Sequence, residues 1–181
     1  IEEALTTLTT AEFNDALKRN RSAFLFRGLP NVSYKLTTSL RWNCKGKAGE
    51  LEPSILRNFS KYAASTSPLN SCWEQMVIGQ HHGLPTRLMD WTYSPLAALH
   101  FATSREDITG MNQHDAVVWA IDITEMNTLL PAKYQKVLND ERAYLFTIDM
   151  LDRVAKDLTT YDNDMGEDGI VLLEPPSIDQ R

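Results

Sequence analysis

Residues 80–92 gather many of the side chains in this chain that could do chemistry. The stretch reads QHHGLPTRLMDWT and contains two histidines, an arginine, an aspartate and a tryptophan. Such groups lose hydrogen bonds to water when they are buried in an apolar core. Apolar helical patterns flank the stretch on both sides, and polar residues held between rigid elements are typical of a binding or catalytic site. We therefore expect these residues to form part of a functional site.

The common catalytic and nucleotide-binding motifs are absent from the sequence. Zinc-binding histidines on a helix usually lie three or four residues apart, whereas His81 and His82 are adjacent, and there is no HExxH or CxxC. A GxSxG nucleophile elbow, a GxxxxGK phosphate loop and a GxGxxG loop are also missing. We therefore expect no metal, no serine hydrolase triad and no ordinary P-loop or Rossmann site.

The side chains that remain in this stretch favour a nucleotide-like ligand. The Arg87 fork suits a phosphate or carboxylate, Trp91 can stack on a base, and Asp90 can orient Arg87 or hold a ribose hydroxyl. The alternative is structural. In that interpretation the same residues form a buried polar network between two helices, with Asp90 holding Arg87 and Trp91 in the core.

A second candidate site follows the short apolar run of residues 23–26, which predicts a buried strand. Arg27 and Gly28 come directly after it. Glycine lets a backbone turn sharply or approach a ligand closely. We expect Arg27 to face a ligand, and the alternative is that it pairs with an internal carboxylate.

The composition restricts the class of protein. The chain has 181 residues, of which 43% are hydrophobic, and this favours one domain, or one domain with an appendage. A net charge of -6 argues against broad attachment to nucleic acid. Cys44 and Cys72 lack metal-ligand spacing, which predicts a reducing, cytoplasmic compartment without a disulfide, and a single bond between them is the alternative. No apolar run approaches the ~20 residues that span a bilayer, so we expect no membrane partner.

The elements that must position these residues predict an α+β fold. A capping box at Thr9 predicts a helix over residues 10–19, within a helical N-terminal part of residues 1–22. Thr92 or Ser94 is expected to cap a helix that has Pro95 in its first turn, and the small residues of this helix favour close packing against a sheet. We expect a helical first half packed on a mainly antiparallel sheet from the second half. Further helices are expected near residues 51–62, 71–82 and 132–138, and strands over residues 116–123, 144–148 and 169–174.

Two motifs together make the chain resemble the FRG domain family. The first is the tripeptide Phe26-Arg27-Gly28. The second is residues 80–102, which follow the pattern QHxGLPTRLLDWTxxPLxALxFA with Met89 where leucine is usual. Residues 175–181 look like the start of the last motif of that family. The resemblance therefore implies a single FRG domain over residues 1–181, truncated at its C-terminus.

More distantly, the chain resembles ADP-ribosyltransferases of the arginine-serine-glutamate type. These enzymes begin with a strand that ends in Arg-Gly, which Arg27 and Gly28 resemble. Later they carry hydroxyl residues before a helix of small residues, which Thr92 and Ser94 resemble. The resemblance implies an ADP-ribosyltransferase-like fold with NAD as substrate. It implies that Arg27, Thr92, Ser94 and Glu174 are catalytic and that Arg27, Gly28, His82, Arg87, Asp90 and Trp91 bind the cofactor.

The implied reaction cleaves the bond between nicotinamide and ribose. ADP-ribose would pass to a macromolecular acceptor or to water, while a glutamate stabilises the oxocarbenium-like ribose. Glu174 ends a late apolar run but lacks the usual Gln/Glu-x-Glu context. If the true counterpart lies beyond Arg181, the domain only binds NAD or a related nucleotide. The remaining alternatives are a non-catalytic recognition module for protein or nucleic acid and, as a third interpretation, a metal hydrolase.

Overall fold

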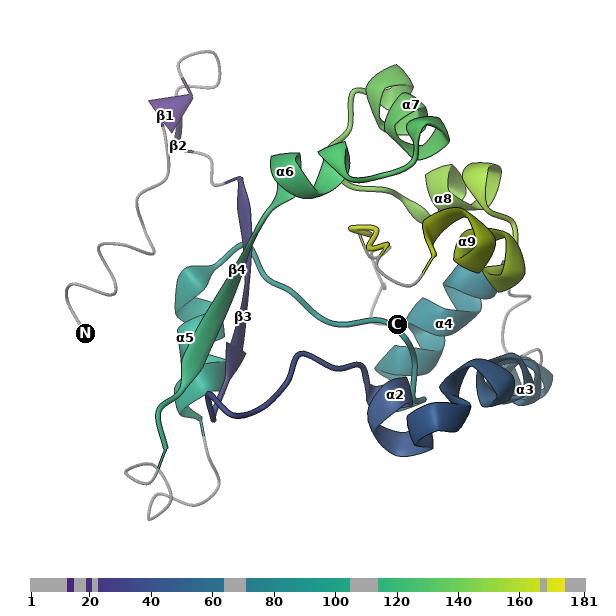
Figure 1. Ribbon diagram of the computed structural model, residues 1–181, viewed down its shortest axis with the longest axis horizontal. Coiled ribbons are helices and arrows are strands. Elements are labelled where there is room, and N and C mark those ends of the chain that lie inside the picture. The colour runs from purple at the N-terminus through teal and green to yellow at the C-terminus, as the bar shows by residue number, and fades with distance from the viewer. Residues whose placement is uncertain are drawn as a thin grey trace. The chain divides into compact units, whose positions relative to one another are not determined.

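The computed structural model shows an arrangement of helices and antiparallel strands, so the predicted α+β class is confirmed (Figure 1). The structure describes residues 23–63, 71–104, 114–166 and 169–174, and the backbone of two short strands near the N-terminus. The chain forms two compact units. Unit 1 contains Ile1–Leu36 and Asp90–Glu125, and unit 2 contains Thr37–Met89 and Met126–Arg181.

Unit 1 is built on two paired strands, β3 (Phe24–Leu29) and β4 (Val117–Asp122). They run antiparallel, with Phe24 opposite Asp122 and Leu29 opposite Val117. The other edge of β3 is bridged by Thr92. The N–H of Phe26 donates to the Thr92 carbonyl at 2.7 Å, and the N–H of Thr92 donates to the Phe26 carbonyl at 2.9 Å. Residues 90–92 therefore lie beside the strand that carries Arg27.

Helix α5 (Pro95–Thr103) packs against β3 at very close range (Figure 1). A Cβ atom added to Gly28 would lie 1.8 Å from the carbonyl oxygen of Ala98 and 2.7 Å from the nitrogen of Ala102. Ala98 and Ala102 are both buried. The small residues of α5 thus allow the close helix–sheet packing that the sequence predicts, and the glycine of the Phe-Arg-Gly tripeptide is a requirement of that packing.

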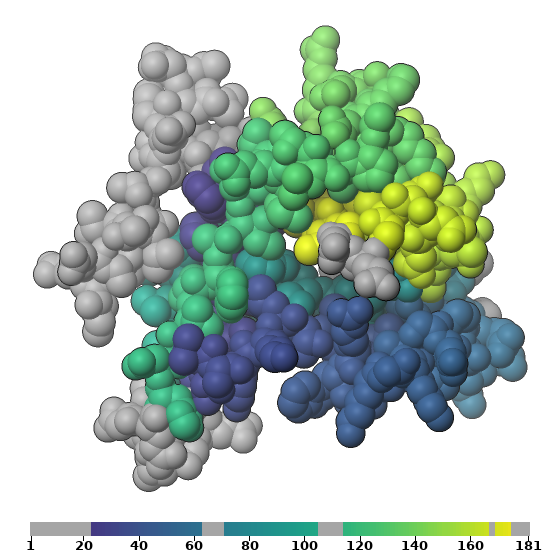
Figure 2. Space-filling model, viewed as in Figure 1, coloured from purple at the N-terminus to yellow at the C-terminus, as the bar shows by residue number. Residues whose placement is uncertain are grey.

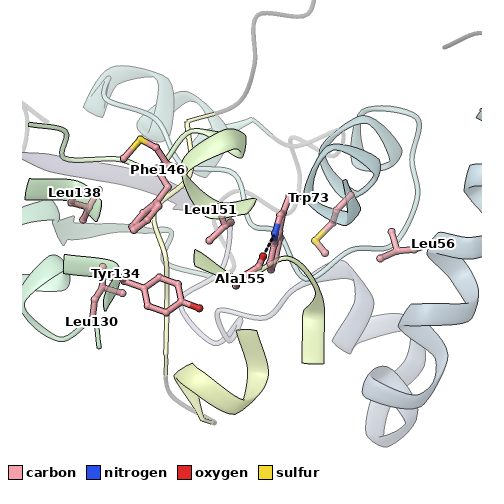
Figure 3. Packing of buried hydrophobic residues seen from close by; sticks show 10 residues of the cluster. Leu56, Trp73, Leu130, Tyr134, Leu138, Phe146, Leu151 and Ala155 are labelled. Carbon is pink, nitrogen blue, oxygen red and sulfur yellow. Dashed lines mark hydrogen bonds between the residues drawn. The ribbon is translucent and has the colours of Figure 1, made fainter. Parts of the chain in front are cut away.

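Unit 2 is helical, and its core joins elements from both halves of the sequence. Trp73 on α4 (Cys72–His81) donates its indole N–H to the carbonyl of Ala155 at 2.7 Å, directly after α8 (Ile148–Val154). Figure 3 shows this contact within the buried cluster. The cluster contains Leu56, Trp73, Met76, Leu130, Tyr134, Leu138, Phe146, Met150, Leu151 and Ala155.

Apart from α3 (Ala48–Ala63), which has 16 residues, the other helices of the described chain are short, and several begin at a side-chain cap. Ser71 caps α4 by accepting a hydrogen bond from the N–H of Glu74, and α4 confirms the helix expected near residues 71–82. Gly83 follows α4 with a φ of 83°, a left-handed conformation that favours glycine at the end of a helix. The remaining elements are α2 (Ser39–Cys44), η1 (Lys45–Lys47), α6 (Ile123–Thr128), α7 (Ala132–Glu141) and α9 (Leu158–Met165).

The structure corrects two predictions about secondary structure. Phe13–Asn14 and Arg19–Asn20 form short antiparallel strands, β1 and β2, so a helix over residues 10–19 is wrong at these positions. The rest of the predicted helical part, residues 1–22, lies outside the described residues. The capping-box pattern there is local, and pairing between strands overrides such local preferences.

The prediction that strands dominate the second half is also wrong for the described residues. Residues 144–148 and 169–174 meet only in a single parallel bridge, between Phe146 and Leu173, and helices α6 to α9 fill the rest. Short apolar runs are ambiguous, because burial alone, without a hydrogen-bonded ladder, also selects them. A single domain over residues 1–181 and a truncated C-terminus stay predictions.

Candidate functional site

Arg27 lies in the middle of β3, and its side chain reaches the neighbouring segment at Asp90. The side chain is half-buried, and Nη1 donates to the carbonyl oxygen of Asp90 at 2.6 Å. This is its one side-chain hydrogen bond within the described residues. Burial lowers the pKa of Arg27, and the charge of Asp90 acts in the opposite direction. The hydrogen-bond partner is thus the neutral backbone carbonyl of Asp90, while the Asp90 carboxylate acts on Arg27 through its charge, and the alternative that Arg27 pairs with a carboxylate stays a prediction.

The two predicted hydroxyl residues shape the entry into α5. The Thr92 hydroxyl oxygen accepts a hydrogen bond from the N–H of Ser94 at 3.1 Å. The Ser94 hydroxyl oxygen accepts from the N–H of Ala97 at 3.2 Å and caps the helix. A hydroxyl can accept and donate at the same time, so each still has a hydrogen to donate to a ligand.

The structure therefore brings Arg27, Asp90, Thr92 and Ser94 together in unit 1. Asp90 is exposed, and Trp91 beside it is half-buried. Gly28 is also there, but its missing side chain makes room for α5. The packing accounts for Gly28 without a ligand, and its role in binding a cofactor stays a prediction.

Arg87 has a different environment from the one predicted. Its guanidinium binds the carboxylates of Glu52 on α3 and Asp162 on α9, with both Nε–O distances to Glu52 at 2.9 Å. Although burial lowers the pKa of Arg87, the hydrogen bonds that its guanidinium donates to the two carboxylates outweigh this effect and raise the pKa. The expectation that Asp90 holds Arg87 is wrong. The buried network of the structural alternative does exist, with different acidic partners.

Thr86 completes this network and is almost fully buried, with a relative exposure of 1%. Its hydroxyl donates to the side-chain oxygen of Gln80 on α4. Its backbone N–H donates to the hydroxyl of Ser39 at 3.1 Å, and its carbonyl accepts from the N–H of Leu40 at 3.1 Å. Thr86 and Arg87 are therefore scaffold residues that attach the loop after α4 to α2, α3 and α9.

Glu52 was not among the sequence candidates, although it is the residue that fixes Arg87. Its exposure is only 2%. In the sequence it lies between Leu51 and Pro53 at the start of a helical pattern, where a glutamate is ordinary. Only its burial distinguishes it, and a single sequence carries no signal of that burial.

His82 and Glu174 are exposed and belong to unit 2. The rings of His81 and His82 meet edge to face with centroids 5.7 Å apart. The backbone N–H of Glu174 donates to the carbonyl of Phe146 at 2.7 Å. Residues 23–63, 71–104, 114–166 and 169–174 contain no group of three or more histidine, cysteine, aspartate or glutamate side chains that could hold a metal ion. The proposed roles of His82 and Glu174 stay predictions.

Trp119 is a candidate that the sequence did not single out as a site residue. It lies on β4 directly opposite Arg27 on β3. Its side chain is 41% exposed, which is unusual for a tryptophan on a paired strand. Period-two alternation along the strand would have placed it on one face, but the register that sets it opposite Arg27 is a tertiary feature.

Both cysteines are free thiols, in agreement with the prediction of no disulfide. Burial raises the pKa of Cys72 to about 11, with smaller contributions from Asp152 and Asp157. The thiol is therefore protonated near neutral pH and is a poor nucleophile. Among the described helices, none has the length and apolar character needed to cross a membrane.

Comparison with known proteins gives one family match. The family model described as FRG domain matches residues 22–110. The matched segment includes Arg27, the loop after α4 and all of α5, and it ends before β4. No curated protein matches the chain. No solved structure matches it either.

Proposed function

This chain belongs to the FRG domain family, and from that premise we propose that unit 1 binds NAD or a related nucleotide through Arg27. The observation that carries the proposal is the surroundings of this guanidinium. Arg27 is half-buried and its hydrogen bond goes to a carbonyl oxygen, which leaves its positive charge unneutralised by that contact. A planar guanidinium binds phosphate through two parallel hydrogen bonds, so a nucleotide phosphate is a suitable partner.

Arg87 provides the contrast that supports this choice. Both arginines belong to the recognised motifs, but Arg87 is already neutralised by Glu52 and Asp162. A second anion would have to displace a carboxylate there. At Arg27 an anion would instead recover electrostatic energy that partial burial has cost the cation. Arg27 is therefore the better phosphate-binding residue.

The resemblance to ADP-ribosyltransferases extends the proposal to fold and chemistry. Strand β3, which carries Arg27 and Gly28, lies beside a hydroxyl-bearing segment that opens a helix, and Thr92 and Ser94 supply those hydroxyls. In the proposed reaction the bond between C1′ of the ribose and the nicotinamide nitrogen breaks, and its electron pair leaves with nicotinamide. Water or an acceptor nucleophile bonds to C1′ and loses a proton. Glu174 is the proposed stabilising carboxylate, and a macromolecule is the proposed acceptor.

Isothermal titration calorimetry with NAD tests the binding proposal, because it measures the affinity directly. Loss of charge-assisted hydrogen bonds is worth ~1.5–3 kcal/mol, so Arg27→Ala should weaken NAD binding by about 10- to 150-fold. Arg27→Lys should bind with intermediate affinity, because it keeps the charge without the fork. The matched control is Arg153→Ala, which removes an exposed arginine paired with Glu141. Equal affinity of the wild type, Arg27→Ala and Arg153→Ala variants would refute the proposal.

A second experiment separates an enzyme from a recognition module. NAD labelled in nicotinamide or in adenine is incubated with the wild type and with Glu174→Gln. If the wild type releases free nicotinamide and Glu174→Gln releases less, the result would support catalysis. Transfer of the adenine label to protein would identify a transferase. Binding of NAD without release of nicotinamide would instead support the non-catalytic alternative. The free thiols fit the reducing, cytoplasmic location proposed for either activity.

A further inference from the structure

The position of Gly28 shows which face of the β3–β4 sheet packs against α5. A Cβ on this residue would point into α5, so the side of β3 that carries Gly28 faces the helix. Successive side chains of a strand alternate between faces, which places Arg27 on the face away from α5. Trp119 is the register partner of Arg27 and therefore shares that face.

Arg27 and Trp119 are direct neighbours on this face. Residues directly opposite each other in an antiparallel pair have Cβ atoms about 4.5–5.5 Å apart. The same face carries the flanking pairs Leu25 with Ile121 and Leu29 with Val117, which are all apolar. One cation thus lies among apolar side chains, with a large aromatic ring beside it.

The indole of Trp119 is available for a ligand. It is 41% exposed, and within the described residues it makes no ring contact and its N–H has no hydrogen-bond acceptor. Figure 2 shows β4, in green, at the surface of the molecule. Buried or bound tryptophan usually pairs its N–H and packs both faces of its ring. An indole held out from a paired strand is a suitable stacking surface for a flat ligand.

We propose that Trp119 stacks on the base of the nucleotide whose phosphate binds Arg27, and that in NAD this base is the neutral adenine. The inference rests on the proposed nucleotide binding and assigns which half of the dinucleotide lies at this face. Aromatic stacking alone accepts any base. The positive charge of Arg27 favours adenine over nicotinamide at this position. The nicotinamide of NAD is a cationic ring, and the guanidinium of Arg27 would repel it.

The test compares ligands that share a phosphate but differ in the base. ADP, nicotinamide mononucleotide in its oxidised form and ribose 5-phosphate are titrated into the wild type, Trp119→Ala and Trp119→Phe, with binding followed by NMR. Stacking on one base is worth ~1–3 kcal/mol, so Trp119→Ala should weaken ADP binding by about 5- to 150-fold. Trp119→Phe should retain most of the affinity, and binding of ribose 5-phosphate should not change.

The matched control is Trp42→Ala, which removes a tryptophan on α2 that is 74% exposed. It should leave ADP binding unchanged. Equal weakening of ADP and ribose 5-phosphate by Trp119→Ala would overturn the proposal, because the residue would then act through the phosphate site or the fold. A larger effect on nicotinamide mononucleotide than on ADP would overturn the assignment of the base.

The outcome also distinguishes failure of this inference from failure of the proposed function. If the wild type binds none of the nucleotides, the proposed function fails and this inference fails with it. If Arg27→Ala weakens ADP binding but Trp119→Ala does not, nucleotide binding stands and only the stacking role is refuted. Thermal melting of each variant shows whether a loss of affinity reflects unfolding.

Discussion

At the scale of single residues, Arg27 and Arg87 show how surroundings decide what one side chain does. Arg87 binds two carboxylates, and one of them, Glu52, is almost inaccessible to solvent. Arg27 binds a backbone carbonyl and lies opposite an exposed tryptophan. The first arrangement saturates the guanidinium and holds the fold together. The second leaves a cation able to bind an anion, which is why the proposed function depends on Arg27.

Gly28 gives a prediction at the same scale. Gly28→Ala should lower the free energy of unfolding by at least about 1–3 kcal/mol, because overpacking forces the backbones of β3 and α5 apart. The new Cβ would otherwise lie 1.8 Å from a carbonyl oxygen. Urea unfolding followed by circular dichroism measures the change.

Gly46→Ala is the matched control, since a Cβ there meets no atom within 4 Å. This variant should change stability little. If both substitutions had equal effects, the close approach of α5 to β3 would not be the reason for glycine at position 28.

At the scale of elements, the loop after α4 acts mainly as a connector. Arg87 links it to α3 through Glu52 and to α9 through Asp162, while Thr86 links it to the start of α2. Every one of these contacts lies within unit 2. The polar residues that the sequence predicts to form part of one functional site are therefore divided, and only the end of the stretch, from Asp90 onward, belongs to unit 1.

Removing Arg87 should destabilise this connection strongly. Arg87→Ala leaves the carboxylate of Glu52 buried without its cation, and breaking a buried pair in this way costs about 3–5 kcal/mol. Arg153→Ala breaks the exposed pair with Glu141 and should cost less than about 1 kcal/mol. Urea denaturation of both variants gives the comparison.

A double variant, Arg87→Ala with Glu52→Gln, sharpens this result. It should recover part of the lost stability, because the buried group is then neutral. A loss for Arg87→Ala as small as that for Arg153→Ala would contradict the structural role of the network.

At the scale of the whole molecule, the chain passes between its two units three times. Neither unit is one continuous segment. The family match over residues 22–110 contains β3 and α5 but omits β4, the strand that pairs along the whole of β3. It also omits the residues from α7 and α8 that complete the core around Trp73.

A fragment of residues 22–110 should therefore fail to fold by itself. It would expose Trp73, Met76 and the β3 edge, and leave Glu52 and Arg87 without Asp162. The near-ultraviolet circular dichroism and amide NMR dispersion of this fragment should be those of an unfolded chain. The control is a fragment of residues 23–174, which retains both units. A well-dispersed spectrum from the shorter fragment would show that the matched segment is an independent domain.

The sequence alone determined the features that depend on near neighbours. It predicted the α+β class, the strands now seen as β3 and β4, a cap at Thr92 or Ser94 before α5, and the family resemblance that the domain match confirms. Caps and strand patterns involve residues a few positions apart, so their chemistry is visible in a short window.

Only the tertiary structure decided the partners of the two arginines. Glu52 and Asp162 lie 35 and 75 residues from Arg87, and Asp90 lies 63 residues from Arg27. The position of Trp119 opposite Arg27 depends on strand register, and the helical second half depends on burial in a shared core. A side chain binds the group that packing brings within hydrogen-bonding distance, and spacing along the chain does not fix that distance.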